Sequence, residues 1–546
     1  MAKLKNLGVM IDVSRNAVMN MDSLKRFLTL LKKMGYNCAM LYTEDTYEVD
    51  GNPFFGYMRG RYSKEELREI DEFAISIGME IIPCIQTLAH LPTYIRWKRS
   101  PSDTSTILLT DDERTYQLID SMFSSLSQCL STRKIHVGMD EAWMLGRGTH
   151  LDIHGYEDPN GIMKRHLARV CEIAEKYNYE VMMWSDMFFR TWNNHGYMIP
   201  KTTVPKEIVD SVPKNVTQIY WDYYASNEER YLGMIDNHRQ MTDKIWFAGG
   251  VWSWQGLVPS NSFSIKTMTA AIDSCKKKKV DSVIFTMWGD DGAECSHFSQ
   301  LPALFYLAEY SKGNKDEAKI KRKFKSLIGI DYDEFMKIEE PNFVLGETQI
   351  MRGDHEYAVN PSKYMLHSDY FVGFLDYSID KEGLNSFEYY RDLAEKLHAT
   401  AKKSRRYGYV FDTVAKLCDI LAFKFDLGLR TRRAYQAGDK AELERLANNE
   451  YARLPKLIEA YTRAFEKQWY IDNKPFGFEL QDNRLGGLLG RTNACRRRLL
   501  DYVNGKISRI DELEVELLPY GKRGGPLAFN NVNMTITVGA QRGDTV

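Results

Sequence analysis

Residues 134–142 read Lys134-Ile135-His136-Val137-Gly138-Met139-Asp140-Glu141-Ala142, a short apolar run that ends in two consecutive carboxylates. Ile and Val suit a strand that is buried on both faces, whereas Asp and Glu are almost never fully buried unless they are paired. One interpretation is that the two acids terminate the strand, as polar turn residues often do. The other is that they mark a rim where the chain enters a cleft, and the pattern of the whole chain distinguishes the two.

Predicted strands and predicted helices alternate over the first 310 residues. Residues 22–34 have helical spacing, with Leu24, Phe27 and Leu31 on one face. Ser63-Lys64-Glu65-Glu66 reads as a capping box, and Ser226-Asn227-Glu228-Glu229 repeats that signature. A last helix of this region is expected at 301–310. The eight predicted strands are 7–13, 38–43, 80–86, 134–138, 180–184, 216–221, 245–251 and 282–288.

Eight βα units with continuously apolar strands predict an α/β fold, a closed (β/α)8 TIM barrel over residues 1–315. An open, doubly wound sheet is the alternative. That fold normally carries a Gly-rich phosphate loop after its first strand, and residues 12–16 (Asp-Val-Ser-Arg-Asn) contain no glycine.

The pattern changes after residue 315, and an α-helical C-terminal domain is expected over 316–546. Its predicted helices are 316–327, 386–402, 410–436, 440–450 and 453–468, whereas 360–362 and 376–382 are expected to be loops. Strands are expected to be absent until 534–538, a short β segment in the tail. Two roles stay open for this domain: packing against the barrel to complete its wall, and a homodimer contact. A lone strand must pair with something, so the second role would suit the strand of the tail.

Composition excludes several classes of protein. The chain is 44% hydrophobic and 27% charged with a net charge of -1, which does not suggest a nucleic-acid-binding surface. The eight cysteines are scattered singly, as in a reduced cytosolic protein. No signal-peptide core and no membrane-spanning run is visible, so a cytoplasmic location is expected. No His/Asp/Glu set has metal-ligand spacing, and no metal or cofactor is expected.

The carboxyl ends of the strands test for function, because a parallel barrel places its catalytic groups there. Acids occur at nearly every predicted end, and four ends carry tryptophan. Trp faces stack on the C–H faces of a pyranose, and carboxylates and Arg bind its hydroxyls, so the pattern favours a carbohydrate ligand. The end residues are Asp12 and Arg15; Tyr42, Glu44 and Asp45; Gln86 and His90; Asp140 and Glu141; Trp184 and Asp186; Tyr220, Trp221, Asp222, Tyr223 and Tyr224; Trp252 and Trp254; and Trp288, Asp290, Asp291 and Glu294.

The adjacency of the two acids then narrows the chemistry. Glycoside hydrolysis usually takes two carboxyl groups that flank the anomeric carbon. Neighbouring side chains on a strand point to opposite sides, so Asp140 and Glu141 are poorly placed as a facing acid and nucleophile. The alternative is a substrate that supplies its own nucleophile, a 2-acetamido carbonyl. Glu141 would then act as general acid and base, and Asp140 would orient the acetamido group and stabilise positive charge.

His136-Val137-Gly138-Met139-Asp140-Glu141 resembles the His-x-Gly-x-Asp-Glu motif of glycoside hydrolase family 20, the β-N-acetylhexosaminidases. The resemblance covers the whole predicted barrel and implies a bare barrel followed by a helical domain, whereas many members carry an α/β domain before the barrel. It also implies a tyrosine that hydrogen-bonds the acetamido oxygen, for which Tyr220, Tyr223 and Tyr224 all remain candidates. The implied sugar ligands are Arg15 and Asp290 for hydroxyls, Asp222 for another hydroxyl, and Trp184, Trp252 and Trp288 for the pocket walls.

Several residues keep two readings. In the functional interpretation, His90 hydrogen-bonds the sugar or orients Glu141. In the structural interpretation, it caps a loop. His136 is expected to orient Asp140 or an acid of a neighbouring strand. Glu44 and Asp45 either support the site or form a polar turn, and Glu294 lies too far past its strand to be included.

The expected activity is that of an exo-acting, retaining β-N-acetylhexosaminidase, which removes terminal β-linked N-acetylglucosamine or N-acetylgalactosamine from glycans or glycoconjugates through an oxazolinium intermediate. One alternative is a barrel glycosidase that uses a protein nucleophile, with Glu141 acting beside Asp222 or Asp290. Another is a sugar-binding protein without turnover, which would not require the Asp140–Glu141 pair.

Overall fold

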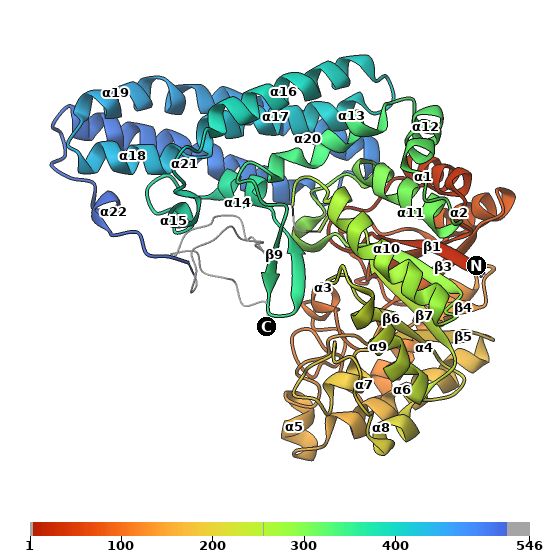
Figure 1. The fold of residues 1–546 in the computed structure, drawn as a ribbon. Helices are drawn as coiled ribbons and strands as arrows, with labels where there is room; N and C mark the ends of the chain where they lie inside the picture. Colours follow the sequence, from red (N-terminus) through yellow and green to blue (C-terminus); the bar gives the residue numbers. More distant parts are fainter. Residues whose placement is uncertain (1–3, 255, 521–546) are drawn as a thin grey trace.

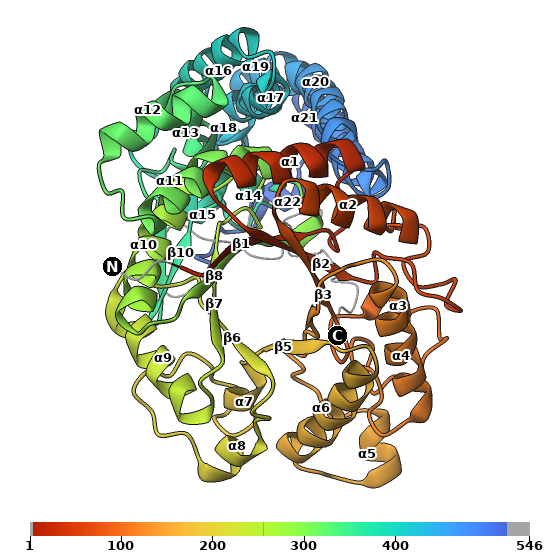
Figure 2. The ribbon, with the colours of Figure 1, turned by 90° about the vertical axis from the view of Figure 1, so that its right-hand side faces the viewer.

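The computed structural model describes residues 4–254 and 256–520 (Figure 1). Eight parallel strands close into a barrel in the order β1 to β8, with β8 paired to β1 (Figure 2). This confirms the TIM barrel and excludes the open sheet. The strands are β1 Asn6–Asp12, β2 Cys38–Glu44, β3 Glu80–Ile85, β4 Lys134–His136, β5 Glu180–Trp184, β6 Thr217–Trp221, β7 Ile245–Gly250 and β8 Ser282–Met287.

Helices cover the outer face of the barrel, which is why the strands are apolar on both faces (Figure 2). The barrel helices are α1 Met21–Met34, α2 Lys64–Ser76, α3 Pro92–Ile95, α4 Glu113–Ser127, α5 Thr149–His154, α6 Pro159–Lys176, α7 Met187–Arg190, α8 Lys206–Ser211, α9 Glu228–Met241, α10 Asn261–Lys277 and α11 Leu301–Ser311, with short 3-10 turns at Asp290–Gly292 and His297–Gln300.

One of the two predicted capping boxes is present. Ser63 and Glu66 exchange both hydrogen bonds at the start of α2. At α9 the prediction is wrong, because Asn227 is the N-cap and accepts from the backbone N–H of Arg230. The hydroxyl of Ser226 instead donates to Glu356, which lies in the C-terminal part of the chain.

A helical layer follows the barrel and packs beside α1 and α11 (Figures 1 and 2). The predicted helix 410–436 is interrupted between α17 and α18. Helix α14 begins within the predicted loop 360–362, and α15 lies within the predicted loop 376–382. Helix α21 lies outside the five predicted helices. The helices are α12 Glu317–Ile328, α13 Tyr332–Met336, α14 Pro361–His367, α15 Asp376–Ile379, α16 Ser386–Lys403, α17 Gly408–Lys424, α18 Leu427–Gln436, α19 Lys440–Asn448, α20 Glu450–Asp472, α21 Phe478–Val503 and α22 Asp511–Glu514, with a 3-10 turn at Lys337–Asn342. No helix in residues 4–254 and 256–520 has the length and apolar character of a membrane span.

The expectation that this region lacks strands before its tail is also wrong. A hairpin of β9 Gln349–Arg352 and β10 His355–Ala358 lies against the loop that follows β6. The backbone N–H of Glu356 donates to the carbonyl of Tyr224 at 2.8 Å, and the ring of Tyr357 lies 5.0 Å from that of Tyr224. The helical domain therefore completes part of the barrel's rim. The predicted strand 534–538 lies outside the described residues, so the dimer contact stays a prediction.

A buried ion cluster joins the barrel to the helical domain. Glu294, which follows β8, forms ion pairs with Lys363 of α14 at 2.8 Å and with Arg484 of α21 at 2.6 Å. The side chains of Glu294 and Lys363 are each 1% exposed. Burial alone would raise the pKa of Glu294, but the two cations outweigh it and lower that pKa to about 2. Glu294 is therefore ionised across the neutral range and holds two elements of the second domain.

Glu294→Gln should destabilise the protein strongly, because it leaves two buried cations facing a neutral amide. Removing one partner of a buried ion pair costs about 3–5 kcal/mol of unfolding free energy. Thermal unfolding followed by calorimetry measures the effect. Glu317→Gln is the matched control, because it breaks an exposed pair with Lys321 that is worth less than about 1 kcal/mol. Equal midpoints for the two variants would show that the buried cluster does not hold the domains together.

Candidate active site

The acid pair lies just beyond the end of β4, in a strained turn. Gly138, Met139 and Glu141 all have positive φ, at 74°, 70° and 50°. A side chain at position 138 could not be accommodated, since its Cβ would lie 2.1 Å from Oε1 of Gln86. Glu44 and His90, at the ends of neighbouring strands, also have positive φ. Non-glycine residues held in this region are uncommon and concentrate at functional sites.

This turn changes the relation between the two carboxylates. The pair was expected to point to opposite sides of a strand, but β4 ends at His136 and the acids follow it. Nε2 of His90 lies 3.3 Å from Oδ2 of Asp140 and 3.9 Å from Oε2 of Glu141. Both carboxyl groups thus lie beside one imidazole and on the same side of the turn.

The three groups hold different charges. Burial opposes ionisation of both His90 and Asp140, but their mutual attraction outweighs it, raising the pKa of His90 to about 9 and lowering that of Asp140 to about 2. The amide of Gln86 also donates to Oδ1 of Asp140 at 2.7 Å. Burial raises the pKa of Glu141 to about 7, with Asp140 and Asp186 adding to the effect. Asp140 is a fixed anion, and Glu141 can hold or release a proton near neutrality.

Arg15 and Asp290 face each other across the junction of β1 and β8. Nη1 of Arg15 lies 3.7 Å from Oδ1 of Asp290, and its Nη2 lies 3.0 Å from Oε1 of Glu44. Asp12 fixes the junction by accepting from the backbone N–H groups of Ser14 and Gly289, both at 2.9 Å. Arg15 and Asp290 are partly exposed, so both can reach a ligand.

The tryptophans form a connected aromatic wall. Trp288 is half-buried and lies 4.7 Å from Tyr42 and 5.9 Å from Trp184, measured between ring centroids. Trp184 is buried behind it. Trp252 is also buried and meets Tyr224 edge to face at 5.6 Å. Tyr224 itself is half-buried.

Tyr223 and Tyr224, which follow β6, make different contacts. The phenol of Tyr223 accepts from the indole N–H of Trp288 at 3.0 Å. Burial raises the pKa of Tyr224, and the charges of Tyr357, Glu141 and Asp290 raise it further. Because its ring is half-buried beside Trp252, Tyr224 stays a candidate for contact with a ligand.

Tyr220 and Asp222 do not join this cluster, contrary to the expectation that both bind substrate. The ring of Tyr220 packs 4.9 Å from that of His238 on α9, and its hydroxyl donates to Asp222. Asp222 is fully buried and forms a 2.8 Å ion pair with Arg230 of the same helix. Both side chains face the barrel helix α9 and already have partners there.

Three further residues differ from or refine the sequence reading. His136 does not bond Asp140; its Nδ1 accepts from the backbone N–H of Gly138, and its ring lies 4.4 Å from that of Trp184. Burial lowers its pKa to about 3, so it is neutral. Glu44 supports Arg15, as described above. Asp45 instead ties two loops together through Arg59 and Thr93.

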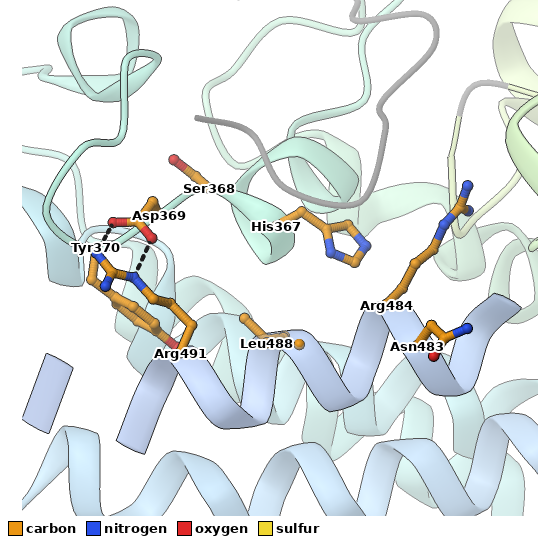
Figure 3. Close-up of a pocket in the computed structure, with 9 residues that line it drawn as sticks. His367, Ser368, Asp369, Tyr370, Asn483, Arg484, Leu488 and Arg491 are labelled. Carbon is orange, nitrogen blue, oxygen red and sulfur yellow. Dashed lines mark hydrogen bonds and ion pairs between the residues drawn. The ribbon is translucent and has the colours of Figure 1, made fainter. Parts of the chain in front are cut away.

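A cavity of about 350 Å³ lies between the loops that follow β4 and β5, and its lining includes Ala142, the residue after Glu141. Its lining combines aromatic, polar and basic side chains. They include Trp143, Met144, Arg147, Tyr156, Arg190, Trp192, Asn194 and His195. A second cavity of about 130 Å³ lies in the helical domain, where Asp369 pairs with Arg491, and shares no residue with the acid cluster (Figure 3).

Sequence reasoning missed Arg190 and Trp143 and did not assign a role to Gln86 or Asp186. Gln86 and Asp186 were visible as strand-end polar residues. Arg190 lies four residues after Asp186, a spacing that brings an acid and a base together on a helix. The β9–β10 hairpin also had a signal, the Gly353-Asp354 turn between two short alternating segments.

The residues that the structure describes contain no group of three or more His, Cys, Asp or Glu side chains arranged to hold a metal ion. The acid cluster itself combines a fixed anion, a cationic imidazole and a carboxyl group that titrates near neutrality.

Two family models match different parts of this chain. Residues 7–234 match the catalytic domain of glycosyl hydrolase family 20, and residues 333–529 match the glycoside hydrolase 20C C-terminal domain. Hexosaminidase D of Bos taurus is 23% identical over 246 residues, which cover 42% of this chain and 65% of that protein. Hexosaminidase D of Homo sapiens is 21% identical over 337 residues, covering 56% of this chain and 66% of that protein. The chain thus spans less than two thirds of these relatives.

Solved structures with a similar arrangement include a GH20 exo-β-N-acetylglucosaminidase from Vibrio harveyi in complex with N-acetylglucosamine. It is 15% identical with a TM-score of 0.45, covering 61% of this chain and 58% of that one. A GH20 β-N-acetylhexosaminidase from Streptomyces coelicolor A3(2) is 16% identical with a TM-score of 0.44, covering 60% of this chain and 70% of that one.

Proposed function

Since this chain belongs to glycoside hydrolase family 20, we propose that it is an exo-acting β-N-acetylhexosaminidase that removes terminal β-linked N-acetylglucosamine or N-acetylgalactosamine. The observation that carries the proposal is the placement of both acids beside one imidazole, with Nε2 of His90 3.3 Å from Asp140 and 3.9 Å from Glu141. Asp140 is held ionised by His90, whereas burial keeps Glu141 protonated up to about pH 7. One fixed anion and one titrating acid, side by side, suit a reaction in which only one of them transfers a proton.

The reaction proceeds with retention and with the substrate's help. Glu141 donates its proton to the glycosidic oxygen as the bond to the anomeric carbon breaks. The acetamido carbonyl oxygen of the same sugar bonds to that carbon and forms an oxazolinium ring. The carboxylate of Asp140 stabilises the positive charge on the ring nitrogen. Glu141, now ionised, takes a proton from water, whose oxygen attacks the anomeric carbon and reopens the ring.

The terminal sugar occupies the space between Arg15, Asp290 and the aromatic wall. Arg15 and Asp290 bind its hydroxyls, as bidentate guanidinium and carboxylate groups do. Trp288, the half-buried tryptophan of this wall, supplies the face on which the sugar ring stacks, and the buried Trp184 and Trp252 support it. Tyr224, which is half-buried beside Trp252 of the aromatic wall, donates a hydrogen bond to the acetamido oxygen. The aglycone leaves through the cavity beside Glu141.

The position of Asp222 argues against the rival mechanism with a protein nucleophile. Its carboxylate is buried and already paired with Arg230, so it cannot reach an anomeric carbon. Asp290 remains accessible, and inhibition by an N-acetyl-thiazoline sugar separates the two mechanisms. That compound resembles the bicyclic intermediate of the substrate-assisted route only, so a lack of inhibition would favour a nucleophile such as Asp290.

A panel of chromogenic β-glycosides tests the proposed function directly. The protein should hydrolyse β-N-acetylglucosaminides, β-N-acetylgalactosaminides or both, and should leave plain β-glucosides and β-galactosides intact, because these lack the internal nucleophile. Rates are followed by release of the aryl alcohol. Turnover of plain β-glycosides at a comparable rate would contradict substrate assistance, and no turnover of any acetamido sugar would contradict the function.

A further inference from the structure

Arg190 is a buried cation beside Glu141 at the end of α7, in the first turn after β5. Its side chain is 9% exposed. Its Nε donates to Oδ2 of Asp186 at 2.7 Å, its Nη1 donates to the carbonyl of His195 at 2.9 Å, and its Nη2 lies 3.6 Å from Oε1 of Glu141. The indole of Trp143 covers the guanidinium at 4.0 Å.

Arg190 and His90 approach Glu141 at different oxygens. His90 lies near Oε2 at 3.9 Å, and Arg190 lies near Oε1 at 3.6 Å. Arg190 also lines the cavity beside the acid pair, whereas His90 does not. Arg190 therefore connects Oε1 of Glu141 to the lining of that cavity.

The same aspartate that holds Arg190 also holds the backbone of Glu141. Oδ2 of Asp186 accepts from the backbone N–H of Glu141 at 3.1 Å and from Arg190. Asp186 is fully buried, so this bridge is shielded from solvent. Asp186 thus holds the main chain of Glu141, and Arg190 lies within ion-pair distance of its side chain.

We propose that Arg190 is a positioning residue for proton transfer by Glu141, holding its carboxyl group toward the aglycone cavity and stabilising its ionised form. The inference rests on the proposed glycosidase function.

The charges that face Glu141 support this role. Asp140 from the same turn, Asp186 after β5, His90 after β3, Arg190 on α7 and the neutral phenol of Tyr224 all act on it. With Glu141 protonated, two anions face two cations. When Glu141 gives its proton to the glycosidic oxygen, one uncompensated negative charge remains. Arg190 is the closer of the two cations to a Glu141 oxygen, and its contact is strongest in that ionised state.

Lysine cannot reproduce this arrangement, although it keeps the charge. The guanidinium uses three nitrogens in three directions, toward Asp186, the His195 carbonyl and Glu141. A single ammonium on a flexible stem cannot hold all three, and it does not stack on an indole in the same way.

Arg190→Gln and Arg190→Lys separate charge from geometry. The measured quantity is kcat/KM as a function of pH for aryl N-acetyl-β-glucosaminides with good and poor leaving groups. The wild-type rate should fall on the alkaline side with a pKa near 7, where Glu141 loses its proton. Loss of the positive charge raises the pKa of Glu141, so Arg190→Gln should move this limb upward by about one pH unit.

Arg190→Lys should leave the alkaline limb in place but slow the poor leaving groups about tenfold or more, as expected for a misplaced general acid. The best leaving group needs little protonation and should be slowed much less. Arg169→Gln on the exposed face of α6 is the matched control and should change neither the limb nor the leaving-group dependence.

Two results would overturn the role of Arg190: an alkaline limb in Arg190→Gln at the wild-type position, or wild-type rates for poor leaving groups in Arg190→Lys. The second measurement keeps the test valid if Arg190→Gln does not fold. A wild-type protein that hydrolyses no acetamido sugar would instead contradict the proposed function, independently of both variants.

Discussion

Glu141→Gln is expected to reduce hydrolysis of unactivated N-acetylhexosaminides by about 10²–10⁴-fold, the usual contribution of a positioned general acid–base. The amide is nearly isosteric with the carboxyl group but can neither donate an acidic proton to the glycosidic oxygen nor take one from water. Burial and the neighbouring acids hold the pKa of Glu141 at about 7, so the wild-type group can serve in both steps.

Steady-state kinetics on a natural disaccharide and on an aryl glycoside with a good leaving group measure this loss. The aryl substrate should be affected less in bond cleavage, because its leaving group needs little protonation. Glu157→Gln is the matched control: Glu157 lies in the neighbouring loop, where it pairs with Arg165, and its loss should leave turnover unchanged. Wild-type activity of Glu141→Gln on the disaccharide would refute the assignment of the acid.

Asp140→Asn is expected to lower kcat by about 10²–10³-fold, the range seen when one preorganised electrostatic contact to a transition state is removed. The wild-type carboxylate stays charged throughout the useful pH range because its pKa is about 2. Asparagine can still accept the hydrogen bond from Gln86, so the geometry should survive while the charge is lost. The loss should appear in kcat more than in KM, since positive charge develops only as the acetamido group cyclises.

Two further readouts make this test specific. His90 loses its anionic partner, so its pKa should fall from about 9, which NMR titration of the imidazole can follow. Asp152→Asn on the exposed surface of α5 controls for the same chemical change without touching the site. A rise in KM with an unchanged kcat would assign Asp140 to ground-state binding and contradict its role as charge stabiliser.

Much of the barrel follows from sequence because its determinants are local. Each strand is a run of apolar, β-branched or aromatic residues, and the helices between them carry one apolar face. The predicted strands start within one residue of those in the structure and extend at most two residues past them. The helical domain was harder to predict. The break between α17 and α18 falls at Phe425-Asp426, within a stretch whose apolar pattern favours one continuous helix.

Only part of the candidate site could be predicted from the sequence. The rule that strand ends carry function gave Arg15, His90, Asp140, Glu141, Tyr224, Trp288 and Asp290, all of which the structure brings to one rim. It failed for Tyr220 and Asp222, which satisfy the same rule. On β6 these two side chains turn outward to α9, where His238 and Arg230 already provide partners. Tyr220 lies within β6, and Asp222, two residues further on, shares its side of the strand. Being near a strand end therefore does not state which side of the barrel wall a side chain faces.

The sequence by itself determined a barrel of eight parallel strands and two adjacent acids on its carboxyl rim, because strand periodicity and motif spacing are properties of neighbouring residues. Only the tertiary structure decided what those acids face. The positive φ angles of Met139 and Glu141 turn both carboxyl groups toward His90, and Asp186 and Arg190 arrive from β5 and α7. The charges that separate the two pKa values lie on three segments far apart in sequence. Electrostatic interaction depends on distance in space, which only the closed barrel fixes.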